Sequence, residues 1–228
     1  MPFEKLLIAN RGEIAVRLIR AAADLGIATV AIYSKDDANS LHTLQADEAL
    51  LLPDKGAQAY LDIDAVVAAS HGAGCDAVHP GYGFLSENAA FAQACVAAGV
   101  TFVGPTAEQL TNFGDKGRAR ALAEANDVPV IPGTAGATSL EEAQDFFVAL
   151  PPGAALMIKA ISGGGGRGTR VVTDLGALAA TYERCSSEAQ ASFGDGDVYV
   201  ERLVRKARHI EVQILGDGAR VTHFGERE

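Results

Sequence analysis

A run of four glycines that follows a lysine is the segment of this sequence best suited to bind phosphate. The glycines occupy positions 163 to 166, between Lys159 and the pair Arg167 and Gly168. Glycine lets the backbone approach a phosphate closely and turn its N–H groups toward the oxygens, while the flanking cations add positive charge. No Lys-Ser or Lys-Thr follows the run, so it is not a Walker A loop. The run is either a loop that covers phosphate or a hairpin tip, and a cost of roughly 1 kcal/mol per glycine in regular structure favours the first.

Two lysines are the next candidates for contact with an anion. Lys159 interrupts the apolar, strand-like segment 156 to 160, and Lys116 begins a segment with helical composition. A lysine that points inward from an apolar strand needs a partner, and a nucleotide phosphate would serve. A lysine on an edge strand can instead point into water, so both placements of Lys159 stay open.

Polar side chains on two further predicted strands could contact a sugar or a base. Glu201 stands where the strand 197 to 203 runs out, and its carboxylate could accept hydrogen bonds from a ribose or a base, or pair with Arg202. Between positions 209 and 214, the period of two places His209, Glu211 and Gln213 on one face. That face is either a polar binding surface or the wet face of an ordinary strand.

Two loops at strand ends are candidate ligand sites. Residues 79 to 88 follow a predicted strand, and residues 10 to 13 follow the first strand. Ligands of open parallel sheets bind at the carboxyl ends of the strands. Ser86 and Asn88 are better explained as caps of the next helix. No Gly-x-Gly-x-x-Gly occurs after the first strand, which weighs against a conventional dinucleotide site.

The elements that must position these residues change in character near residue 110. Before it, hydrophobic periodicity predicts strands at 6 to 9, 29 to 33, 76 to 79 and 101 to 103, with helices at 12 to 25, 62 to 71 and 88 to 98. Strand, helix and strand within the first 33 residues form a βαβ unit, so this half predicts an open parallel α/β sheet.

The second half predicts antiparallel strands and begins with a helix through residues 116 to 126. Segments 156 to 161 and 169 to 173 flank the glycines, as two strands of a hairpin do. Further strands are predicted at 197 to 203, 209 to 215 and 220 to 224, and Asp217-Gly218 between the last two is a strong hairpin signal.

Composition excludes several classes of protein. The net charge of −10 over 228 residues argues against general nucleic-acid binding. The basic cluster from Arg202 to His209 would, taken alone, be a solvated patch. No apolar run approaches the roughly 20 residues that span a bilayer, and the first residues lack a signal peptide's hydrophobic region. Three widely spaced cysteines match no metal site and predict reduced thiols in the cytoplasm.

Six segments together resemble one known family. They are LIANRGEIA (7 to 15), HPGYGFLSEN (79 to 88), FVGP (102 to 105), GDK (114 to 116), GGGGRG (163 to 168) and RHIEVQ (208 to 213). In this order and at this spacing they resemble the biotin carboxylases, which are ATP-grasp enzymes of biotin-dependent carboxylases, and the resemblance covers the whole chain.

The resemblance implies two domains and three small molecules. A Rossmann-like domain is expected at residues 1 to 110, followed by a partial α+β ATP-grasp domain at 111 to 228, with a glycine-loop β lid at about 130 to 203. In the family, ATP phosphorylates bicarbonate, carboxyphosphate releases CO2, and a biotin nitrogen captures it. The resemblance therefore implies ATP, Mg2+ and biotin carried on a carrier protein.

The resemblance also assigns residues to the nucleotide and to biotin. Lys116 and Lys159 would contact phosphates, Glu201 would face adenine or ribose, and His209 would reach the ribose. Tyr82 and Gly83 would lie on the biotin side. The full set of expected ATP-binding residues is Lys116, Lys159, Gly163, Gly164, Gly165, Gly166, Glu201, Arg202, Leu203, Val204 and His209.

Two departures from the family pattern qualify these expectations. Thr169 stands where the family usually has methionine. The family's bicarbonate lysine, magnesium-binding glutamates and biotin-facing arginine would lie beyond Glu228, so no catalytic residue or metal ligand is assigned. The chain is thus expected to be an incomplete segment that does not carboxylate free biotin by itself.

The resemblance further implies a biotin carboxyl carrier and a carboxyltransferase as partners, and a homodimer in the full-length form. It does not choose among acetyl-CoA, propionyl-CoA, pyruvate and urea as the final acceptor. The alternatives are another ATP-grasp ligase, such as a carbamoyl-phosphate synthase, and a non-catalytic nucleotide-binding module.

Overall fold

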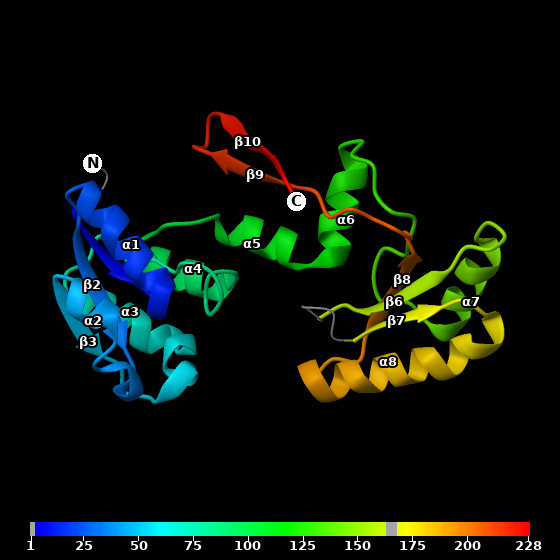
Figure 1. Cartoon of the computed structure of the whole chain (residues 1–228), viewed down its shortest axis with the longest axis horizontal. Helices are drawn as coiled ribbons and strands as arrows, with labels where there is room; N and C mark the ends of the chain where they lie inside the picture. The colour runs from blue at the N-terminus through cyan, green and yellow to red at the C-terminus, as the bar shows by residue number, and fades with distance from the viewer. Residues whose placement is uncertain (1–2, 163–167) are drawn as a thin grey trace. The chain divides into compact units, whose positions relative to one another are not determined.

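The computed structural model describes residues 3 to 162 and 168 to 228, and the chain divides into two compact units (Figure 1). The first unit is Met1–Asp115 and the second is Lys116–Glu228. The four predicted phosphate-binding glycines, 163 to 166, lie outside the described residues.

The first unit is built on the parallel sheet that the periodicity predicts. Its strands are β1 (Lys5–Ile8), β2 (Ala28–Tyr33), β3 (Glu48–Leu51), β4 (Ala77–His79) and β5 (Thr101–Phe102). They lie in the order β3-β2-β1-β4-β5, and every neighbouring pair is parallel. The helices are α1 (Gly12–Asp24), α2 (Leu41–Gln45), α3 (Ile63–Gly72), α4 (Ala89–Ala97) and α5 (Ala107–Gly114), with 3-10 turns at Lys35–Asp37 and Gly56–Leu61.

Apolar side chains cover both faces of this sheet. Leu6 and Ile8 of β1 point to the face covered by α1, and Leu7 points to the face covered by α3 and α4. Burial on both faces explains why the strands read as apolar runs rather than as alternating patterns. The strand order reverses between β1 and β4, and their carboxyl ends form the topological switch point of the sheet.

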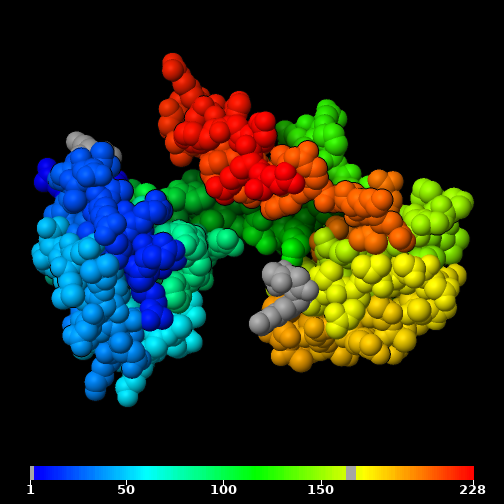
Figure 2. All heavy atoms as spheres, viewed as in Figure 1, coloured from blue at the N-terminus to red at the C-terminus, as the bar shows by residue number. Residues whose placement is uncertain are grey.

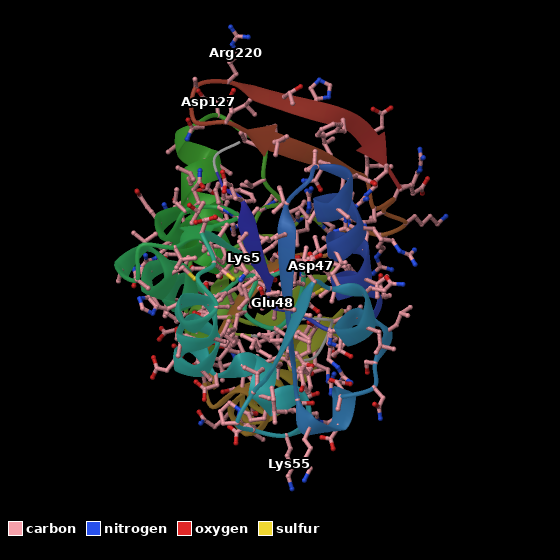
Figure 3. The ribbon with its side chains drawn as sticks, turned by 90° about the vertical axis from the view of Figure 1, so that its left-hand side faces the viewer. Lys5, Asp47, Glu48, Lys55, Asp127 and Arg220 are labelled. Atoms are coloured by element: carbon pink, nitrogen blue, oxygen red, sulfur yellow. The ribbon has the colours of Figure 1, made fainter. Side chains whose placement is uncertain are left out.

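An ion pair ties the edge strand β3 to the centre of the sheet. The ammonium of Lys5 in β1 lies 2.7 Å from a carboxylate oxygen of Glu48 in β3, across the intervening strand β2 (Figure 3). Asp47, which precedes β3, accepts hydrogen bonds from the backbone N–H and the hydroxyl of Thr29, both at 2.8 Å. Polar contacts thus fix the register of a strand that the sequence prediction missed.

The second unit contains the predicted antiparallel strands. β6 (Leu156–Ala160) lies between β7 (Thr169–Val172) and β8 (Val198–Arg202) in an antiparallel sheet. The helices are α6 (Lys116–Ala125), α7 (Leu140–Ala149) and α8 (Leu178–Phe193), with a 3-10 turn at Leu175–Ala177. α7 and α8 pack on one face of the sheet around Leu156, Ile158 and Val200. This leaves the other face of β6 and β8 for polar side chains.

The last two strands form the hairpin that Asp217-Gly218 predicts. β9 (Glu211–Gly216) pairs antiparallel with β10 (Val221–Arg227). Its atoms, orange to red, lie at the surface on the side shown in Figure 2. Val212 is 47% exposed and Gln213 is also exposed, so side chains on both faces meet water. The alternating pattern therefore does not mark a buried face here.

No helix within residues 3 to 162 and 168 to 228 is long and apolar enough to cross a membrane.

Candidate functional site

The face of the β6 and β8 sheet that turns away from α7 and α8 carries the predicted cation and carboxylate. Leu156, Ile158 and Ala160 of β6 point into the core, so the period of two sends Lys159 to the opposite face. The same alternation in β8 buries Val200 in the core and sends Glu201 to the face of Lys159.

Lys159 and Glu201 form an ion pair across the two strands. Their nitrogen and oxygen lie 2.5 Å apart, and the side chains are 30% and 11% exposed. In the antiparallel register, Lys159 is opposite Tyr199 and Glu201 is opposite Met157, so the pair is a diagonal contact. Of the two placements predicted for Lys159, it points toward a partner, and that partner is a carboxylate. Glu201 pairs with Lys159 rather than with Arg202.

A glycine-containing segment runs along the outer edge of β8 and holds Glu201 in place. Gly133 forms an antiparallel bridge with Glu201, and Arg202 donates its backbone N–H to the carbonyl of Pro132 at 2.8 Å. A Cβ on Gly133 would lie 2.8 Å from the carbonyl oxygen of Val200. Only glycine allows this close approach, so the segment fixes the carboxylate from its backbone side.

Lys116 lies beside the end of β6. Its ammonium donates a hydrogen bond to the carbonyl oxygen of Ile161 at 3.1 Å and contacts that of Ala160 at 3.5 Å. Burial lowers the pKa of Lys116, and the nearby Lys159 cation lowers it further. Lys116 and Lys159 therefore lie close enough for their charges to interact, and Lys159 also pairs with Glu201. An anion placed between two neighbouring ammonium groups stabilises the charged form of both.

Two residues that sequence reasoning missed adjoin these lysines. Arg120 follows Lys116 by one turn of α6, and its buried Nε has no hydrogen-bond partner within the described residues. Burial raises the pKa of Tyr199 to about 12, Glu201 acts in the same direction, and Arg120 acts against them. The spacing of four residues from Lys116 was the sequence signal for Arg120.

The remaining predicted nucleotide residues follow β8. Leu203 donates its backbone N–H to Ala155 at 2.8 Å, and Arg202 is half-buried. Val204 and His209 are exposed, and His209 precedes β9 because that strand begins at Glu211. The structure thus brings Lys116, Lys159 and Glu201 together, whereas it places His209 in an exposed connection.

The loop from His79 to Asn88 lies at the switch point of the first unit. Tyr82 is 58% exposed, and its hydroxyl donates a hydrogen bond to Glu13 of α1. Gly83 has a positive φ of 73° and no atom within 4 Å of a Cβ built on it. Asn88 caps α4 by accepting the N–H of Phe91 at 3.0 Å, which confirms the prediction for that residue.

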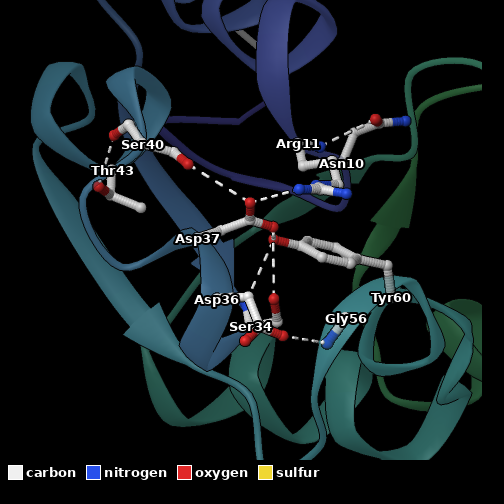
Figure 4. A network of polar contacts seen from close by, with 9 residues as sticks. All are labelled: Asn10, Arg11, Ser34, Asp36, Asp37, Ser40, Thr43, Gly56 and Tyr60. Carbon is white, nitrogen blue, oxygen red and sulfur yellow. Dashed lines mark hydrogen bonds and ion pairs between the residues drawn. The ribbon is translucent and has the colours of Figure 1, made fainter.

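A buried carboxylate network lies beside this loop (Figure 4). Asp37 pairs with Arg11, and it accepts a hydrogen bond from the hydroxyl of Tyr60 at 2.8 Å. Burial would raise the pKa of Asp37, but hydrogen bonds from Arg11 and Tyr60 outweigh it and hold the pKa below its usual range. Burial and Asp37 raise the pKa of Tyr60 to about 12. The network therefore stays charged on Asp37 and neutral on Tyr60 at neutral pH.

Within the part of the chain that the structure describes, no group of three or more His, Cys, Asp or Glu side chains is arranged to hold a metal ion. Glu201 already pairs with Lys159.

Two family models match the chain, one to each half. The model described as biotin carboxylase, N-terminal domain, matches residues 2 to 110. The model described as carbamoyl-phosphate synthase L chain, ATP binding domain, matches residues 115 to 228. The boundary between the matches lies close to the division of the structure between Asp115 and Lys116.

Curated relatives and solved structures match nearly the whole chain. It is 50% identical to pyruvate carboxylase of Staphylococcus aureus over 99% of its length, and 51% identical to human mitochondrial pyruvate carboxylase over 100%. The biotin carboxylase domain dimer of 2-oxoglutarate carboxylase from Hydrogenobacter thermophilus, solved with MgADP, ADP and bicarbonate, is 40% identical over 99% of the chain, with a TM-score of 0.93. The chain spans 20% and 19% of the two pyruvate carboxylases and 50% of the solved domain.

Proposed function

Because the chain belongs to the biotin carboxylase family, we propose that it forms the ATP-binding part of a biotin-dependent carboxylase. Such an enzyme is an ATP-dependent ligase that forms a C–N bond between biotin and a carboxyl group derived from bicarbonate. The proposed domains are residues 1 to 110, which carry the biotin-side loop, and residues 111 to 228, which bind the nucleotide.

The observation that carries this proposal is the convergence of Lys116, Lys159 and Glu201 on one side of the β6 and β8 sheet. Lys116 and Lys159 would hold the phosphates, because their ammonium groups lie near each other and each can donate charge-assisted hydrogen bonds to phosphate oxygens. Glu201 would then accept hydrogen bonds from adenine or ribose. Phosphoryl transfer depends on charge stabilisation and exclusion of water, and these side chains would supply the charge stabilisation.

The remaining nucleotide contacts are proposed for Arg202, Leu203, Val204 and His209, with the glycines at 163 to 166 over the phosphates. Bound ATP would supply the phosphoryl group that activates bicarbonate. The described residues fit the nucleotide but offer no cluster for Mg2+, so no metal ligand is proposed within them. Tyr82 and Gly83 are proposed for the biotin side, where Tyr82 is exposed at the switch point.

The partners and the acceptor are also proposals. The names of the relatives, pyruvate carboxylase and 2-oxoglutarate carboxylase, favour a 2-oxo acid over an acyl-CoA as the final acceptor. We propose a biotin carrier domain and a carboxyltransferase domain as partners, and a homodimer, as in the solved 2-oxoglutarate carboxylase domain. The cytoplasm is the proposed compartment because Cys75, Cys95 and Cys185 are buried free thiols.

A second ligase class follows from the model matched by the second half. A carbamoyl-phosphate synthase would use the same ATP-binding domain. The match of residues 2 to 110 to a biotin carboxylase domain favours the carboxylase. Biotin-dependent changes at the loop 79 to 88 support the carboxylase, whereas glutamine-dependent turnover without any response to biotin supports the synthase.

Calorimetric titration of the chain with MgATP and MgADP tests the nucleotide site directly. We expect one nucleotide per chain and loss of most of the binding in Lys159→Gln. A folded chain that shows no heat of binding at millimolar MgATP contradicts the proposed function.

A further inference from the structure

We propose that Asn10 is a positioning residue that fixes the turn from Pro80 to Phe84 and thereby sets where Tyr82 and Gly83 are presented. The part of this inference that concerns biotin rests on the proposed function. Asn10 is buried away from solvent, so its effect on a ligand would be exerted through the turn.

Asn10 is fully buried at the carboxyl end of β1, where the strand order reverses. Its side-chain nitrogen donates hydrogen bonds to the carbonyl of Pro80 at 2.7 Å and to that of Tyr82 at 2.9 Å. Its side-chain oxygen accepts the backbone N–H of Arg11 at 2.9 Å. Both amide donors are therefore used on the turn, while the acceptor holds the start of α1.

The turn fits so closely over Asn10 that one position must be glycine. Gly81 has a φ of 67°, and a Cβ on it would lie 2.6 Å from a methyl carbon of Ile14 and 2.8 Å from the amide nitrogen of Asn10. Its N–H is accepted by Nδ1 of His79 at 3.0 Å. Burial, together with the cation of Arg17, lowers the pKa of His79, so the imidazole is neutral and can accept this bond.

Both ends of the turn are anchored, and its middle is exposed. Phe84 has a positive φ of 42°, which is uncommon for residues other than glycine. Its ring packs against that of Tyr60, with 5.3 Å between the ring centroids. Tyr60 belongs to the Asp37 network, and Arg11 links that network to Asn10 (Figure 4). A strained turn at a strand end that is held by surrounding contacts is a common way to preorganise a binding group.

Asn10 and Asn88 use opposite ends of their side-chain amides, so replacement by aspartate should affect the two positions differently. Asn10 uses its N–H2 donors, so Asn10→Asp places carboxylate oxygens against two carbonyl oxygens. Asn88 uses only its oxygen, as an acceptor for Phe91, so Asn88→Asp keeps that cap. Asn88→Asp is thus the matched control, and Asn10→Ser is the milder second variant.

Two readouts report on the turn itself in the 228-residue chain. Amide exchange at Gly81, whose N–H is bonded to Nδ1 of His79, reports whether the turn is held. The pKa of Tyr82, read from its ring-carbon NMR shift, reports whether its hydroxyl still meets Glu13, because that hydrogen bond raises it. A general loss of stability would not selectively move the Tyr82 titration. Glu13→Ala, which has no side-chain acceptor, supplies the Tyr82 pKa expected when that contact is lost.

We expect at least tenfold faster exchange at Gly81 in Asn10→Asp, a smaller increase together with a lower Tyr82 pKa in Asn10→Ser, and neither change in Asn88→Asp. Folded Asn10→Ser with parent-like exchange and Tyr82 titration overturns the proposal. Free biotin added to the parent should shift the signals of Tyr82 and Gly83, and less so in Asn10→Ser. A parent that does not respond to biotin contradicts the proposed function, while exchange and titration still decide the role of Asn10.

Discussion

The ammonium of Lys159 in β6 lies 2.5 Å from a carboxylate oxygen of Glu201 in β8, as a diagonal pair on the sheet face opposite the helical core. The Glu201 carboxylate is therefore paired with the same ammonium, that of Lys159, to which the proposed function assigns a phosphate. A triphosphate must compete with Glu201 for Lys159, and Glu201 must find another partner when the nucleotide binds.

Replacing Glu201 by glutamine should separate these two effects. Glu201→Gln removes the competitor of Lys159 and a negative charge beside the phosphates, so inorganic triphosphate should bind roughly fivefold tighter, which matches the scale of a part-exposed ion pair. ATP should gain less or lose affinity, because the carboxylate no longer accepts bonds from adenine or ribose. Calorimetric titrations with both ligands measure the difference.

Glu188→Gln is the matched control for this change. Glu188 in α8 pairs with Arg170 at 2.7 Å, so it is a carboxylate of a different ion pair, and its side chain is more exposed than that of Glu201, 35% against 11%. Its replacement should change neither affinity. Equal changes for triphosphate and ATP in Glu201→Gln would show that the carboxylate acts only through general charge.

Removing either lysine should weaken ATP binding by about ten- to a hundredfold. Lys116→Gln and Lys159→Gln each remove a charge-assisted hydrogen bond to phosphate worth roughly 1.5–3 kcal/mol, while the glutamine stem keeps most of the packing. Calorimetric dissociation constants for MgATP measure the effect. Lys55→Gln, at an exposed position of the first unit, is the control. Dissociation constants within twofold of the parent in both folded variants would remove the lysines from the proposed site.

The sequence predicts the sheet strands of this protein better than its helices. The apolar runs of β1, β2 and β4 reflect burial on both faces, and Asp217-Gly218 predicts the last hairpin. The hydrophobic periodicity does not predict α8. Only Leu178, Cys185 and Ala189 of this helix are buried, and so few buried positions do not give a clear helical period in the sequence.

The site residues were predictable by type and their partners were not. Lys159 and Glu201 each stand out in an apolar strand, but their pairing depends on the register of β6 against β8, which residue spacing does not contain. Residue type alone does not predict the role of Asn10. That role depends on the pairing of β1 with β4, which brings the end of β1 beside the loop that follows β4.

The Asp37 network should make stability depend on pH in the acid range. The folded-state pKa of Asp37 lies below its ordinary value, so the carboxylate contributes stability above the unfolded-state pKa of about 3.9, and this contribution is lost as pH falls through the folded-state pKa. Asp37→Asn should therefore cost about 1–3 kcal/mol at pH 7, and less below pH of about 4.

Urea unfolding of parent and Asp37→Asn between pH 7 and the acid range measures this difference. Asp47 and Asp76 also have lowered pKa values through backbone hydrogen bonds, but they are present in both proteins and cancel. Arg11 is 41% exposed, so water and salt weaken its contribution and place the expected cost toward the lower end. A gap that stays constant with pH would assign the cost to packing rather than to the charge of Asp37.

Two glycines of the same loop should respond differently to the same substitution. Gly81 and Gly83 both have positive φ, 67° and 73°, so alanine at either costs roughly 1 kcal/mol of backbone strain. At Gly81 the new Cβ would lie less than 3 Å from atoms of Ile14 and Asn10. At Gly83 it would have no atom within 4 Å. Because overpacking costs a further 1–3 kcal/mol or so, Gly81→Ala should lower the free energy of unfolding by about 2–4 kcal/mol and Gly83→Ala by about 1. Urea unfolding of the two variants measures this, and equal losses would mean that the turn does not rest on Asn10.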